Sequence, residues 1–313
     1  LHAHSEPVPA EGIFKLGLDI STGSIPTDPQ ALLERLLTVS LLEAQYNADY
    51  DVVQYQTSPL VTDWLRENHL LDEDPKWLTI AADYQMYLRK NERRTLSQTI
   101  TAHQALRRAA RKAEADRLTL DFIVGPFTRA GLYATLLTEW LPSIIDSEDL
   151  QVRGEALGQM GKILLHSGDF EHALPLMKQS LAIRQQIGDK AGEAATLGNI
   201  GTNYQAQGDY ATALDYLKQS LQIRQQIGDK AGEGTTLNNI SQIFKAQGDY
   251  ATALDYLKQS LQIFQQIGDK AGEGTTLNNI SQIYDAQGDY ETALDYLKQS
   301  LAIQEQIGDK VGL

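Results

Sequence analysis

The chain has 313 residues, a formal net charge of −14 and no cysteine. The absence of cysteine excludes disulfides, thiolate metal sites and thiol nucleophiles, and it agrees with the reducing cytoplasm, where we expect the protein. No apolar run approaches the roughly 20 residues that a membrane helix needs, so we expect no membrane partner. The acidic balance disfavours nucleic acid as a partner, because an acidic surface repels phosphate groups.

Residues 1–70 carry 10 acidic and 3 basic side chains and differ in kind from the rest. They predict a helix over about 28–42, a short strand over 51–56 and a second helix over 57–65. This outline resembles the winged-helix segment that follows the nucleotide-binding module in signal-transducing ATPases with numerous domains (STAND ATPases). A small helical cap without that ancestry is the alternative. The acidic charge argues against DNA binding, and the resemblance implies a relay of nucleotide state instead.

Residues 71–150 predict helical hairpins with a weaker pattern, including a helical pair over roughly 75–114 and a turn near Gly131. We expect them to cap a repeat array and to link it to residues 1–70. Within them, 71–130 has 11 basic against 8 acidic side chains. This charge predicts a solvated helical face or a contact with an acidic neighbour.

A forty-residue block over 208–247 returns at 248–287 with three positions changed. A related copy covers 168–207, and a partial one begins at Gly288. In the second copy the periodicity predicts helices over about 231–246 and 250–266. Gly248 suits a left-handed helix end, and Asp249 suits the cap of the next helix. The sequence therefore predicts an all-α array of stacked helix hairpins over 151–313.

Apolar and small residues recur at fixed offsets from each Gly-Asp turn. In the second copy they are Leu237, Ile240, Ser241, Phe244, Gly248, Tyr250, Ala253 and Leu257. This pattern is similar to the tetratricopeptide repeat (TPR) family, although the family's usual period is about 34 residues. The longer repeat and the string Thr236–Ser241 resemble the kinesin light chain branch. The resemblance implies a right-handed superhelix whose first helices line a concave groove, with a protein or peptide as the partner.

By this resemblance, polar side chains of the first helices face the groove. The predicted binding residues are Thr202, Gln205, Thr235, Asn238, Asn239, Gln242, Lys245, Thr275, Asn278, Asn279, Gln282 and Asp285. Carboxamides both donate and accept hydrogen bonds, so they suit the backbone of an extended peptide. A solvated face without a ligand is the alternative.

The two near-identical copies differ at Arg224 against Phe264, Phe244 against Tyr284, and Lys245 against Asp285. The last difference reverses a charge in the predicted groove. We add Arg224 and Phe264 to the predicted binding residues, because variation among copied units is expected where a partner is recognised. Drift at exposed positions explains the same differences.

The chain contains no phosphate-binding loop, no HExxH and no GxSxG sequence, and its histidines are scattered. We therefore expect no enzyme, no metal and no cofactor, and any ATPase portion would lie before Leu1. The leading hypothesis is the sensor region of a larger STAND ATPase, which would bind a protein or peptide and self-associate through its ATPase portion. A constitutive scaffold and the ligand-sensing part of a transcription regulator are the alternatives.

Overall fold

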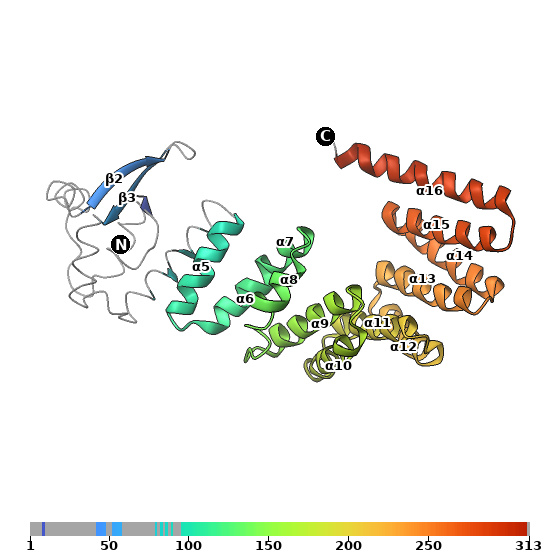
Figure 1. Cartoon of the computed structure of the whole chain (residues 1–313), viewed down its shortest axis with the longest axis horizontal. Helices are drawn as coiled ribbons and strands as arrows, with labels where there is room; N and C mark the ends of the chain where they lie inside the picture. The colour runs from blue at the N-terminus through green and yellow to red at the C-terminus, as the bar shows by residue number, and fades with distance from the viewer. Residues whose placement is uncertain are drawn as a thin grey trace. The chain divides into compact units, whose positions relative to one another are not determined.

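The computed structural model describes residues 8–9, 42–47, 52–57, 79, 82, 83, 85, 86, 89 and 95–311. The chain divides into two compact units, Leu1–Leu132 and Tyr133–Leu313 (Figure 1). The three-part division expected from the sequence, 1–70, 71–150 and 151–313, stays a prediction.

In the first unit, strands β1 (Val8–Pro9), β3 (Val52–Thr57) and β2 (Leu42–Asn47) form an antiparallel sheet in that order. Leu42 pairs with Thr57, and Val8 pairs with Tyr55. Strand β3 confirms the predicted strand over 51–56. Leu42, however, begins a strand instead of ending a helix, because apolar and polar residues alternate from Leu42 to Asn47 with the period of a strand. The rest of both predicted helices, 28–41 and 58–65, lies outside the described residues.

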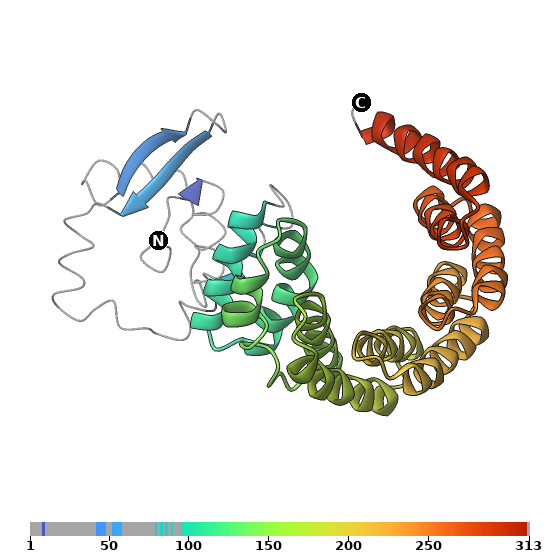
Figure 2. The same cartoon turned by 45° about the vertical axis from the view of Figure 1, so that its right-hand side comes forward.

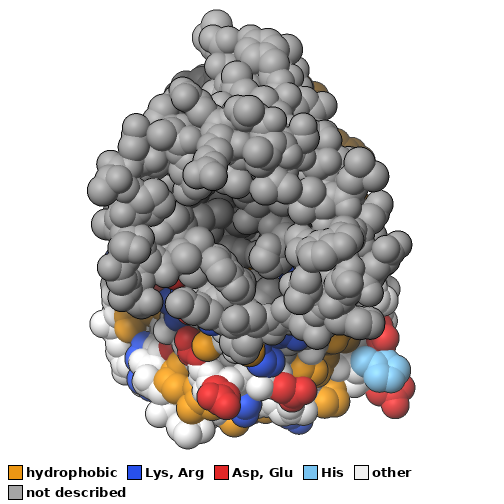
Figure 3. Space-filling view, turned by 90° about the vertical axis from the view of Figure 1, so that its left-hand side faces the viewer, with side chains coloured by type: hydrophobic (Ala, Val, Ile, Leu, Met, Phe, Trp, Pro, Cys, Tyr) orange, Lys and Arg blue, Asp and Glu red, His pale blue; other side chains and the backbone are white. Residues whose placement is uncertain are grey.

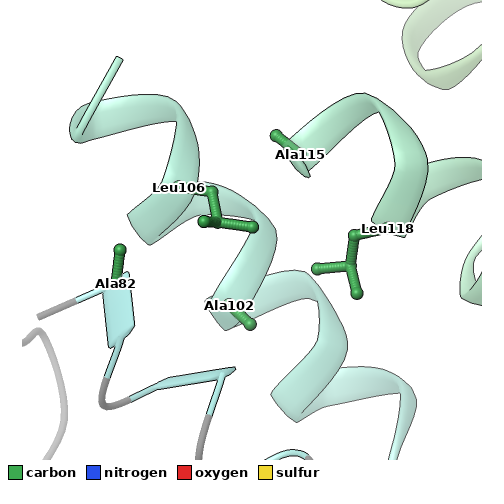
Figure 4. Close-up of a cluster of buried hydrophobic side chains, with 5 residues drawn as sticks. All are labelled: Ala82, Ala102, Leu106, Ala115 and Leu118. Carbon is green, nitrogen blue, oxygen red and sulfur yellow. The ribbon is translucent and has the colours of Figure 1, made fainter. Parts of the chain in front are cut away.

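The first unit also contains α5 (Leu96–Arg108), α6 (Lys112–Phe122) and α7 (Val124–Arg129). Thr95 begins α5 as its cap, and its hydroxyl oxygen accepts a hydrogen bond from the Gln98 amide at 3.2 Å. Five small or branched apolar residues of this unit are buried together: Ala82, Ala102, Leu106, Ala115 and Leu118 (Figure 4). Leu106 of α5 and Leu118 of α6 fill the space between these two helices.

The described secondary-structure elements of the second unit are all helices. Its elements are α8 (Tyr133–Thr135), the π-helix η1 (Leu136–Trp140), α9 (Leu150–His166), α10 (Phe170–Ile187), α11 (Lys190–Ala206), α12 (Tyr210–Ile227), α13 (Lys230–Ala246), α14 (Tyr250–Ile267), α15 (Lys270–Ala286) and α16 (Tyr290–Val311). From α9 on they pair as hairpins. They follow an arc with α11, α13 and α15 on its inner side and α12, α14 and α16 on its outer side (Figure 2). The predicted array of helix hairpins is confirmed.

Glycine and aspartate end and begin these helices as the sequence predicts. Gly248 and Gly268 adopt φ angles of +79° and +71°, a conformation that other residues rarely adopt. Asp249 then caps α14 by accepting from the Thr252 amide at 3.1 Å, and Asp269 caps α15 by accepting from Gly272 at 3.0 Å. The hydrogen bonds from Thr252 lower the pKa of Asp249.

Two kinds of contact hold the array together. Within a hairpin, a buried serine of the second helix donates to a carbonyl of the first, as Ser260 does to Gly234 at 2.8 Å. Between hairpins, apolar side chains of one second helix pack against the next first helix, as Leu257 packs near Ile280. Because every joint reuses the same residue positions, the sequence repeat becomes a repeated interface.

Candidate functional site: the inner face of the array

A row of carboxamides stands on the first helices of successive hairpins. Positions forty residues apart are structurally equivalent, and four of them carry Gln159, Asn199, Asn239 and Asn279. All four side chains are half-buried, on α9, α11, α13 and α15. We call this set the amide row. Sequence reasoning missed Gln159 and Asn199, although the forty-residue spacing from Asn239 points to both.

Hydroxyl and carboxamide groups flank the amide row. The hydroxyls of Thr202, Thr235 and Thr275 donate to carbonyls of their own helices at 3.1, 3.0 and 2.9 Å. Their oxygens therefore remain available as acceptors. Gln242 is half-buried, and its Nε2 has no hydrogen-bond partner within the described structure. A buried unpaired donor is costly.

Helix α9 carries the charged residues Glu155 and Lys162 beside the amide row. On α11, α13 and α15, charge enters this face at one edge. The equivalent residues there are Gln205, Lys245 and Asp285, so neutral, positive and negative side chains follow one another along the array. Lys245 Nζ donates to Gln282 Oε1 on the next repeat at 2.7 Å. Asp285 is exposed. The predicted charge reversal therefore exists at equivalent places of two adjacent repeats.

Asn238 departs from its predicted place in the groove. Its side chain is only 7% exposed, and its Nδ2 donates to Thr276 Oγ1 of the next repeat at 2.8 Å. Its Oδ1 accepts from Asn279 at 3.4 Å. Asn238 thus joins two repeats and is not free to bind a ligand. Its counterpart Asn278 is half-buried at the same position of the last repeat.

Arg224 and Phe264 do not line the inner face, which corrects their predicted role. Arg224 Nη1 bonds to Asp229 Oδ2 at 2.6 Å, and its Nε donates to Ser220 at 3.3 Å. Phe264 is 3% exposed and lies over Gly234 and Gly272. Both side chains occupy the end of a second helix, where they pack against neighbouring first helices. Their difference changes the interior of the array.

Several described basic side chains of the first unit pair with acidic side chains of the same unit. Arg111 pairs with Asp83 at 2.5 Å and with Glu114 at 2.6 Å, and Lys112 pairs with Asp116 at 2.5 Å. In the face shown in Figure 3, the described basic and acidic side chains are interspersed. This mixture fits the predicted solvated helical face better than a phosphate-binding surface.

The described residues lack two further features, a metal-binding cluster and a membrane-spanning helix. These residues contain no group of three or more His, Asp or Glu side chains placed to hold a metal ion. None of their helices is long and apolar enough to cross a membrane.

Between residues 150 and 311, helix hairpins with a forty-residue period and Gly-Asp turns define a helical repeat protein. Residues 153–226 and 232–306 match the tetratricopeptide repeat family, so the array consists of tetratricopeptide repeats. Such repeats are typically interaction modules without enzymatic activity, and they bind proteins or peptides. No curated protein is significantly similar to the chain.

Several solved structures share the fold at low sequence identity. A Rap protein complexed with Competence and Sporulation Factor has a TM-score of 0.55 and 14% identity, over 79% of this chain and 71% of that one. The STAND ATPase with a tetratricopeptide repeat sensor from Pyrococcus horikoshii has a TM-score of 0.52 and 18% identity, over 99% of this chain and 50% of that one. BtubC from P. vanneervenii has a TM-score of 0.51 and 15% identity, over 75% and 91%. This chain thus spans about half the length of the ATPase.

Proposed function

We propose that the inner face of the array binds an extended peptide segment of a partner protein. The observation that carries this proposal is the amide row, in which four carboxamides stand on successive first helices. Each carboxamide offers one acceptor oxygen and two donor hydrogens, which match the carbonyl and N–H groups of an extended backbone. A partner bound in this way is recognised first by its main chain.

The surroundings of the amide row define the chemistry of this peptide. On α13 and α15 the adjoining positions carry threonine and glutamine, so a peptide with small or polar side chains fits these two repeats better than one with many charges. Lys245 and Asp285 then favour one orientation of the peptide. An acidic side chain of the peptide is attracted to Lys245, and a basic side chain is attracted to Asp285. The net charge of −14 further disfavours strongly acidic peptides.

Binding is tested with the whole chain and a displayed library of twelve-residue peptides. The best selected peptide is titrated by calorimetry into the wild type, into N199A/N239A, and into the outer-face control Q219A/Q259A. Two lost hydrogen bonds at about 1 kcal/mol each predict affinity lower by roughly tenfold or more for the inner-face variant. The control should bind within twofold of the wild type. Equal affinity for both variants, or a library without binders, would refute the proposal.

We further propose that binding reports to a larger STAND ATPase, with residues 1–70 as a winged-helix relay and 71–150 as the link. The fold shared with the Pyrococcus horikoshii ATPase over 99% of this chain supports this arrangement. A relay requires that the peptide favour one of two states of the chain.

Hydrogen exchange of the whole chain, with and without the selected peptide, tests the relay. We expect altered protection in α5 to α7 as well as in the array. Changes confined to the array would instead indicate a scaffold that binds without relaying.

A further inference from the structure

A series of three hydrogen bonds runs between the neighbouring first helices α13 and α15 (Figure 2). The Thr276 hydroxyl donates to the Gly272 carbonyl at 2.8 Å, and the Thr276 oxygen accepts from Asn238 Nδ2, also at 2.8 Å. Asn238 Oδ1 then accepts from Asn279 Nδ2 at 3.4 Å. Thr276 and Asn238 are buried, whereas Asn279 of the amide row is half-buried. We call the side chains of Thr276, Asn238 and Asn279 the clasp.

The Gly272 carbonyl fixes the direction of the whole series. A carbonyl only accepts, so the hydroxyl hydrogen of Thr276 is committed to it, and the Thr276 oxygen can only accept from Asn238. Asn238 therefore turns its nitrogen to Thr276 and its oxygen to Asn279. Asn279 must in turn donate to Asn238, which leaves the Asn279 oxygen on the opposite edge of its carboxamide. No described residue donates a hydrogen bond to that oxygen.

The two preceding joints of the array lack the clasp. Gly158 and Gly198 stand at the positions equivalent to Asn238, and glycine has no carboxamide. Asn199 and Asn239 of the amide row are therefore not oriented from the preceding helix, and each can present its oxygen or its nitrogen to a ligand. Both helices of the clasp pack against a helix before them and a helix after them. The difference between the joints thus comes from one side chain, Asn238.

We propose that Asn238 is a positioning residue for the bound peptide: through the clasp it makes Asn279 present its oxygen, so the peptide must offer a backbone N–H at this place. This inference rests on the proposed peptide-binding function of the inner face. The peptide residue that meets Asn279 cannot be proline or another N-alkylated residue, because these lack the hydrogen. Opposite Asn199 and Asn239 the peptide can offer a carbonyl or an N–H. The clasp therefore adds a main-chain requirement at one repeat of an otherwise tolerant surface.

The clasp is tested first without a peptide, by NMR of the whole chain labelled with ¹⁵N-asparagine. The side-chain amide signals of Asn279 and Asn239 are assigned by their disappearance in N279D and N239D. In the wild type the Asn279 amide should show a higher heteronuclear NOE than the Asn239 amide. Its exchange with water should also be about fivefold slower, because one of its hydrogens is held by Asn238.

Three variants separate the clasp from general packing. N238A removes it and should bring the Asn279 amide to the values of the Asn239 amide. N238D keeps an acceptor for Asn279 and should restore the wild-type values. G198N builds a clasp at the preceding joint and should slow the exchange of Asn239. A Cβ atom at Gly198 has room, since it would lie 3.6 Å from Ser220 Oγ, an ordinary contact. Circular dichroism checks that all three variants are folded.

Peptide binding is then measured by calorimetry with the best peptide from the twelve-residue library and with versions of it that are N-methylated at one residue each. At one residue, N-methylation should lower the affinity for the wild type about fivefold, as the loss of one hydrogen bond predicts. The same change should cost at most about twofold in N238A, where the Asn279 amide can turn, and about fivefold again in N238D. The outer-face control Q219A should reproduce the wild-type pattern.

Two results would overturn the proposal. The first is an Asn279 amide that is as mobile as the Asn239 amide in the wild type. The second is a set of N-methylation losses that are the same in the wild type and in N238A at every peptide residue. A library without binders would refute the proposed function, and with it the presentation of the Asn279 oxygen to a peptide. The NMR comparison would still decide whether Asn238 holds Asn279, so the two failures are distinguishable.

Discussion

The effect of a single side chain on the stability of the array depends on the residues that it contacts. Phe264 lies over Gly234, and a Cβ atom added to that glycine would stand only 2.8 Å from Phe264 Cζ. One repeat earlier the equivalent residues are Ala194 and Arg224. The aromatic ring thus accompanies glycine, whereas a guanidinium accompanies alanine here and glycine in the first repeat, at Arg184 and Gly154. The ring therefore requires the glycine and the guanidinium does not, so the two positions are expected to depend on each other.

This dependence gives a prediction for a double-mutant cycle. In the wild type, G234A should lower the free energy of unfolding by about 1–3 kcal/mol, the usual cost of overpacking. In the F264R background the cost should fall below half of that value, because Ser260 and Asp269 stand where Ser220 and Asp229 bind Arg224. Urea denaturation measures all four proteins. Equal costs in both backgrounds would show that the positions are independent.

At the scale of the helices, the aspartate caps make stability depend on pH. Asp209 and Asp249 accept from the Thr212 and Thr252 amides, both at 3.1 Å. Hydrogen bonds from the side chains of these threonines, and then from their amides, lower the pKa values of both aspartates in the folded protein. The folded state therefore binds fewer protons than the unfolded state near their ordinary pKa of 3.8. Stability from these caps is complete above that pH and is lost as the pH falls through the lowered values.

We accordingly predict that D209N/D249N makes the chain less sensitive to acid. Asparagine also caps helices but does not titrate, so the urea midpoint should fall less steeply between about pH 5 and pH 3 than in the wild type. The exposed variant D215N/D255N is the matched control, since it removes the same charges from the middle of the same helices. A double variant as acid-sensitive as the wild type would mean that the caps contribute nothing to this slope.

At the scale of the whole array, each repeat contacts mainly its neighbours, so complete repeats are exchangeable. Deleting 190–229 removes α11 and α12 and joins Asp189 to Lys230, which recreates the original Asp-Lys connection. Helix α10 then meets α13 in place of the similar α11. The chain should keep a cooperative thermal transition by circular dichroism, with the midpoint lowered by several degrees because one interface is lost.

The matched deletion of 210–229 removes α12 alone and places two first helices in succession. The alternation of first and second helices is then broken, and the serine–carbonyl bonds within that hairpin cannot form. We expect loss of the cooperative transition or aggregation. If both deletions behaved alike, the forty-residue hairpin would not be the unit of stability.

Much of this structure could be read from spacing alone. The forty-residue period, the helix boundaries near 231–246 and 250–267, and the Gly248-Asp249 turn follow from local conformational preferences, which act over a few residues. The buried positions of Leu237, Ile240 and Leu257 follow from helical periodicity. The conformation of Leu42 was harder to predict. Apolar and polar residues alternate over only six residues from Leu42, and this short strand pattern begins where the predicted helix ends.

The sequence by itself determined the repeat, the helices and which face of each is apolar, because these properties depend on residues near one another in the chain. The tertiary structure decided which polar residues remain available to a partner. Asn238 is used by Thr276, thirty-eight residues away, and Phe264 is covered by glycines on two different helices. Local sequence sets the pattern of a helix, but burial depends on which other helix packs against it.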